Sequence, residues 1–100
     1  MVTIDHDWEN APRFGELDVG TRPVPLGQCR ARYVRLQNRY TNSDNTPNQQ
    51  SLYWGDATHQ SCEIVPGQFT DWIPIRDIAD IYVRTAAGNA TVAWLAVDRV

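Results

Sequence analysis

Short apolar runs, each bounded by glycine, proline or asparagine, recur along the chain. The clearest runs are residues 33–38, 52–56, 63–68, 80–83 and 88–92. Runs of this length and spacing are typical of a chain that folds back on itself into small antiparallel sheets. With weaker runs at 17–26 and 69–75 they predict about seven strands, the number expected of a β-sandwich. No helical pattern of useful length competes with this interpretation.

Two strands show the most informative alternation. In residues 28–38, Val34 and Leu36 fall on one face and are expected to face the core, while Arg35 falls on the other. Residues 90–97 are apolar on both faces, which predicts that one face meets the core and the other a subunit interface. A tight turn at 87–89 is expected to join this strand to residues 79–85 as a hairpin. Alternation in residues 69–75 places Phe69 and Trp72 on opposite faces.

The connections are marked by their own residues. Pro23 and Pro25 predict an edge strand or an extended connector at 17–26, because proline cannot donate to a central ladder. The pair at 66–67 fits the two central positions of a type II turn. Residues 75–80 can form a single helical turn. The polar loop at 39–51 is either a binding surface or a solvated, mobile insertion.

The first sixteen residues show no clean periodicity. They combine acidic residues with isolated Trp8 and Phe14, and Pro12 interrupts any helix. This pattern predicts an extended arm whose aromatic rings pack on their own domain or on a neighbour, because such rings gain most from burial. The expected organisation is an N-terminal arm at 1–16 and a β-sandwich domain at 17–100.

The length of 100 residues fits one domain, and the net charge of −3 argues against nonspecific nucleic-acid binding. All nine basic residues are arginine, which excludes lysine chemistry. A GC-rich genome explains this bias, and bidentate contacts to carboxylates at interfaces are the functional alternative. No apolar stretch approaches the roughly 20 residues of a membrane helix, so no membrane partner is expected. The N-terminus lacks the blocks of a signal peptide, which favours synthesis in the cytoplasm.

Candidate chemistry is sparse. Cys29 and Cys62 each fall in a predicted strand, where a small buried cysteine is the default interpretation and a disulfide the alternative. With His59 and Asp56 they could form a metal site, but one of the two ligand pairs of a structural zinc site is missing. No nucleophile elbow or phosphate loop is present, so we expect no catalytic residues, no metal, no cofactor and no enzymatic activity.

Other acids and aromatics have two interpretations each. Asp77 and Asp80 could form a carboxylate pair for glycoside hydrolysis, but a capping residue and a loop acid explain them better. Most tryptophans are expected in the core, with a sugar-stacking platform as the alternative. Tyr53 and Trp54 are adjacent in a strand, so one of them must face outward or toward a partner.

The chain resembles small β-sandwich accessory proteins of tailed-phage virions, and the resemblance covers residues 32–97. It is carried by the order of five short segments: V-R-L-Q-N, L-Y-W-G-D, I-V-P-G-Q, D-I-Y-V and G-N-A-T-V. These proteins include capsid decoration (cement) proteins and the knobs of head or tail fibres. The resemblance implies an all-β, jelly-roll-like sandwich and a noncatalytic structural role. Such a protein would be made in the host cytoplasm and would bind the capsid exterior, bridging major capsid proteins. A homotrimer is expected rather than a dimer. The alternative it implies is a receptor- or glycan-binding fibre tip, with Trp54 and the loop 39–51 contacting sugar.

Six residues are the candidate contacts with a partner. We expect Trp8 and Phe14 to anchor the arm in a groove of a neighbouring subunit. Arg32 and Arg35, in the most basic stretch of the chain, are expected to pair with acids of the capsid or a sister protomer. Tyr53 and Trp54 complete the set. A rival hypothesis is a small enzyme or metalloprotein around His59 and Cys62.

Overall fold

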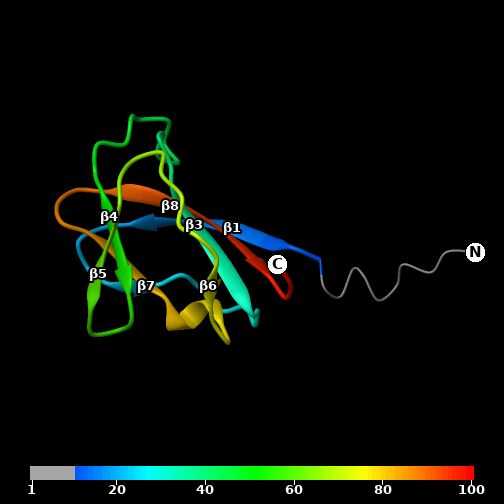
Figure 1. The fold of residues 1–100 in the computed structure, drawn as a ribbon. Helices are drawn as coiled ribbons and strands as arrows, with labels where there is room; N and C mark the ends of the chain where they lie inside the picture. The colour runs from blue at the N-terminus through cyan, green and yellow to red at the C-terminus, as the bar shows by residue number, and fades with distance from the viewer. Residues whose placement is uncertain (1–10) are drawn as a thin grey trace, which may run out of the picture.

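The computed structural model describes residues 11–100, which form two antiparallel four-stranded sheets packed face to face (Figure 1). The elements in chain order are β1 (Arg13–Val19), β2 (Val24–Pro25), β3 (Tyr33–Asn38), β4 (Leu52–Gly55), β5 (Gln60–Ile64), β6 (Ile73–Pro74), the 3-10 helix η1 (Ile78–Asp80), β7 (Tyr82–Thr85) and β8 (Ala90–Val97). The all-β sandwich expected from the sequence is confirmed.

The connectivity of these strands is that of a jelly roll. One sheet has the order β1-β8-β3-β6 and the other β2-β7-β4-β5. The chain crosses from one sheet to the other at almost every connection, and only β4 and β5 are neighbours both in sequence and in a sheet. An eight-stranded double sheet of this kind is the jelly-roll arrangement.

The expected hairpin between β7 and β8 is wrong. The segment around Gly88 does reverse the chain with a positive φ of 70°, but β7 pairs with β2 and β4, whereas β8 pairs with β1 and β3. Turn residues specify that a chain reverses its direction, not which strand it pairs with afterwards. The connection therefore carries the chain between the two sheets.

The boundary expected between arm and domain also differs from the structure. β1 begins at Arg13 and pairs along its whole length with β8, from Arg13 opposite Ala96 to Val19 opposite Ala90. Residues 13–16, expected in the arm, are therefore the first part of an edge strand of the sandwich. Residues 1–10 of the expected arm, with Trp8, lie outside the described residues.

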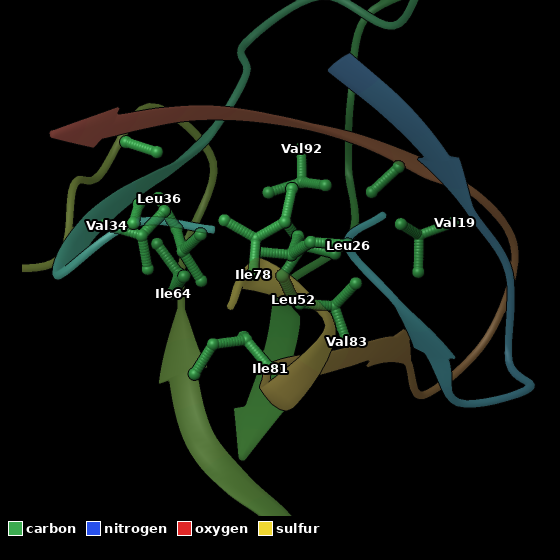
Figure 2. Close-up of a cluster of buried hydrophobic side chains, with 13 residues drawn as sticks. Val19, Leu26, Val34, Leu36, Leu52, Ile64, Ile78, Ile81, Val83 and Val92 are labelled. Carbon is green, nitrogen blue, oxygen red and sulfur yellow. The ribbon is translucent and has the colours of Figure 1, made fainter. Parts of the chain in front are cut away.

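The core lies between the two sheets, and Figure 2 shows its side chains converging from both layers. Val34 and Leu36 are fully buried, as the alternation in their strand predicted. Burying one such side chain contributes roughly 1.5–3 kcal/mol. The cluster of buried residues consists of Val19, Leu26, Ala31, Val34, Leu36, Leu52, Ile64, Ile78, Ile81, Val83, Ala90, Val92 and Ala96.

Several local predictions are confirmed. β2 pairs only with β7, at the edge of its sheet, where its proline removes no central hydrogen bond. η1 is the expected single turn, and Asp77 caps it. Gly67 has a φ of 84°, and the N–H of Gln68 donates to the carbonyl of Val65, as a type II turn requires.

Candidate partner-binding surface

Exposed aromatic side chains gather on the outer face of the sheet β1-β8-β3-β6. Phe14 on β1 is 76% exposed, and it lies directly opposite Leu95 of β8, which in turn lies opposite Arg35 of β3. Residues opposite one another in antiparallel strands share a face. We call Phe14, Leu95, Arg35, Phe69 and Trp72 the outer strip.

Arg35 organises the outer strip. Its guanidinium carbon lies 5.4 Å from the ring centroid of Phe69 and also 5.4 Å from that of Trp72. Its Nε donates a hydrogen bond of 3.2 Å to the backbone carbonyl of Thr70. A guanidinium near an aromatic face is attracted by the ring quadrupole. These contacts hold the segment that carries both rings against β3.

The prediction that Phe69 and Trp72 lie on opposite faces is wrong, and a local irregularity explains why. Phe69 forms an isolated bridge with Gln37, and Pro74 pairs with Tyr33. Between these two points β3 has three residues, whereas the facing segment has four. An extra residue of this kind breaks the two-residue alternation of a strand. Both rings consequently lie near the same side chain, Arg35.

A shallow apolar pocket of about 150 Å³ lies within this surface. Phe69 and Leu95 line it together with Ala93, and Gln37 adds a polar side chain. Phe69 is itself 57% exposed. A partner could therefore pack against the exposed ring of Phe69 and insert a side chain into the pocket beside it.

The six predicted contacts separate into different places. Phe14 and Arg35 meet on the outer strip. Arg32 does not join them, because it precedes β3 and lines a separate hollow with Arg30 and Arg76. Trp8 lies outside the part of the chain that the structure describes.

Tyr53 and Trp54 face opposite sides of β4, as their adjacency predicted. Trp54 packs partly buried against the core. Tyr53 lies opposite Arg84 of β7, and the Arg84 guanidinium carbon is 5.1 Å from its ring centroid. These residues belong to the other sheet, so they do not extend the outer strip.

The rival site around His59 and Cys62 is built as a turn. Asp56 Oδ1 accepts hydrogen bonds from the backbone N–H groups of His59 and Thr58, and these bonds lower the pKa of Asp56. His59 Nδ1 lies 3.8 Å from the same oxygen. Within residues 11–100, His, Cys, Asp and Glu side chains nowhere gather in threes as a metal site would require.

The two cysteines are both free, and the expected burial is wrong for each, whereas the expected strand position is confirmed for Cys62 and wrong for Cys29. Cys29 is half-buried in the segment before β3, and Cys62 is exposed on β5. An exposed position on an edge strand can hold any side chain, because nothing packs against it. The apolar character of Cys62 therefore did not indicate that it is buried.

None of the helical segments in residues 11–100 has the length and apolar character needed to cross a bilayer. Comparison with known protein families, with curated proteins and with solved structures finds no match for this chain.

Proposed function

We propose that the chain is a noncatalytic structural component of a tailed-phage particle, a decoration protein that binds the capsid exterior through the outer strip. Its partner is the major capsid protein, and its role is to stabilise the head lattice by bridging neighbouring copies. The observation that carries the proposal is the outer strip itself, where Phe14 and Phe69 are largely exposed around an ordered Arg35.

Three features support a protein partner for this surface. Phenylalanine, tryptophan and arginine are enriched at the centres of protein interfaces. Arg35 is already held in place by two rings and a backbone carbonyl, so less side-chain freedom is lost on binding. The jelly roll is a fold of viral capsid proteins, although it is also found in lectins.

The alternative function, a glycan-binding fibre tip, has less support. Trp54, the ring expected to stack on sugar, packs partly buried against the core. The loop 39–51, also expected to contact sugar, is held to the sandwich by buried amides. The outer strip offers rings of its own, so the location of the protein on a particle distinguishes the two functions.

The first experiment is gold labelling of intact phage particles with an antibody against this chain. Regular label over the head supports the decoration role, and label confined to the tail favours the fibre-tip alternative. Particles without label contradict both functions.

The second experiment tests the surface. Phe14→Ser with Phe69→Ser is expected to abolish binding to capsids that lack the protein, because both rings lose their apolar contact with the partner. Val100→Ser is the control, since Val100 is 71% exposed but lies at the C-terminus. Equal binding by both variants would remove the outer strip from the proposal.

A further inference from the structure

A hollow of about 620 Å³ lies at the end of the sandwich where β1 and β3 begin and β8 ends. It shares no lining residue with the pocket of the outer strip. Four of the nine arginines of the chain line it: Arg13, Arg30, Arg32 and Arg76. We call this feature the arginine hollow.

Backbone hydrogen bonds fix the segments that carry these arginines. The N–H of Ala31 donates to the carbonyl of Arg76, and the N–H of Ile75 donates to the carbonyl of Arg32. The N–H of Arg32 donates in turn to the carbonyl of Val97 at the end of β8. The arginines therefore project from one hydrogen-bonded framework and not from independent loops.

The arginine hollow has an excess of positive charge. Asp98 is the one acid in its lining, and four positive charges against one negative charge leave +3, in a chain whose total is −3. Asp98 pairs with Arg13 at 3.1 Å. Within residues 11–100, Arg30, Arg32 and Arg76 make no ion pair.

One donor in this lining has no partner among the residues that the structure describes. Arg13 Nε is buried and makes no hydrogen bond with any described residue. Buried polar groups in native proteins are nearly always hydrogen-bonded, so an orphan donor beside a charged hollow indicates a missing acceptor. A carboxylate accepts from guanidinium groups in a planar, often bidentate geometry.

We infer that the arginine hollow binds the carboxylates of an acidic peptide segment, and that residues 5–9 of this chain supply such a segment. This assignment is independent of the outer strip. The segment reads Asp5-His6-Asp7-Trp8-Glu9, with a carboxylate at every second position. An extended peptide presents alternate side chains on one side, so a segment with this spacing brings its three carboxylates to one face.

The geometry of attachment favours this segment over an unrelated anion. It precedes Arg13, which itself lines the hollow, so its point of attachment lies at the site. A long polyanion such as nucleic acid would meet the negative charge of the rest of the chain. The segment can come from the same copy or from a second copy.

The test uses the full chain with Asp5→Asn, Asp7→Asn and Glu9→Gln, so that its own segment no longer competes. A synthetic peptide of residues 1–10 with an amidated C-terminus is titrated into it by calorimetry. We expect saturable binding that weakens as salt rises from about 0.05 M to about 0.2 M, because screening shortens the range of charge interactions. Adding Arg32→Gln and Arg76→Gln should weaken binding roughly tenfold for each arginine, as for other charge-assisted hydrogen bonds.

Arg22→Gln with Arg84→Gln is the matched control, because these arginines lie outside the hollow, and it should leave the affinity unchanged. Light scattering of the natural chain and of the acid-neutral variant identifies the source. A mass that falls on neutralising the acids places the segment in a second copy, and an unchanged mass places it in the same copy. Three outcomes would overturn the inference. The peptide does not bind, both arginine pairs weaken its binding equally, or the chain binds inorganic phosphate but not the peptide.

Discussion

The side-chain amide of Asn48 donates a hydrogen bond of 2.6 Å to Oδ1 of Asn38, and both residues are buried. Asn38 Nδ2 donates in turn to the carbonyls of Gln50 and Ile64, each at 2.8 Å. The polar loop 39–51 is thus fastened to β3 and β5 through one amide at its root.

This network predicts a large effect of a small substitution. Asn38→Ala removes the side-chain donor to two carbonyls and leaves the Asn48 amide with only its bond to the carbonyl of Arg39. The free energy of unfolding should therefore fall by about 2–4 kcal/mol. Urea denaturation measures the loss. The control is Gln49→Ala in the same loop, where the side chain is exposed. Similar losses for both variants would show that the loop is not held by Asn38.

Two glycines provide a comparison of steric demand. A Cβ added at Gly55 would lie 1.9 Å from the carbonyl oxygen of His59, in the connection between β4 and β5. Because the obstructing atom is backbone, Gly55→Ala should destabilise the protein by about 2–4 kcal/mol. Gly20→Ala is the matched control, since its nearest neighbour is a side-chain oxygen at 3.6 Å. Thermal unfolding that is equally affected by both would contradict the strand geometry around Gly55.

The contact of Arg35 with its rings can be measured as a coupling energy. Arg35→Ala, Phe69→Ala and the double variant form a cycle in which we expect about 0.5–1 kcal/mol of coupling, typical of a partly exposed cation–π pair. Urea denaturation at two salt concentrations gives the values. A coupling energy of zero would mean that Phe69 is not held by Arg35 in solution.

Asp77 predicts a specific dependence of stability on pH. Its Oδ1 accepts hydrogen bonds from the backbone N–H groups of Ala79 at 2.9 Å and Cys29 at 3.0 Å, and these bonds lower the pKa of Asp77 from its ordinary value of 3.8. A lowered pKa in the folded state means that the stabilisation is complete above the ordinary value. It is lost as the pH falls through the lowered pKa.

Asp77→Asn should therefore be less stable than the natural chain at neutral pH, and this difference should shrink below pH 3.8. Urea midpoints measured from neutral to acid pH give the two curves. Asp80→Asn is the control on the same helical turn, because Asp77 and not Asp80 accepts the backbone hydrogen bonds of Ala79 and Cys29. Parallel curves for Asp77→Asn and the natural chain would contradict the capping role.

Strands marked by alternation or by a continuous apolar run could be predicted from sequence, and a strand with neither signal could not. Residues 90–97 were expected as a strand and form β8 with the same bounds. β1 was missed because its inner face includes Gly15, which lies opposite Trp94. A Cβ on Gly15 would lie 2.8 Å from Cζ2 of that ring, so the tryptophan fills the space of the missing side chain. The ring of Trp94 on β8 thus fills an inner position of β1. The sequence of β1 has no apolar residue at that position to indicate a strand.

The candidate surface was half predictable for a related reason. Phe14 and Arg35 were both expected to contact a partner. They lie on one face because each is opposite Leu95 of β8, and no local sequence pattern specifies that β8 pairs with β1 and β3. Phe69 was not expected there, because a prediction from two-residue alternation assumes a regular strand and does not allow for the extra residue before β6. The arginine hollow was missed as a unit, since Arg13 and Arg76 come from segments far from Arg30 in the sequence.

The position of β8 has a consequence for how the protein is made. β8 is the last strand of the sandwich in chain order and lies between β1 and β3, so β1 has no neighbour in its sheet until β8 has been synthesised (Figure 1). Earlier strands must wait with their apolar faces uncovered, and pairing between the two ends of a chain is slow because of the long loop it closes. Nascent chains arrested before residue 90 should therefore be protease-sensitive throughout, and emergence of β8 from the ribosome should trigger folding of the whole domain at once.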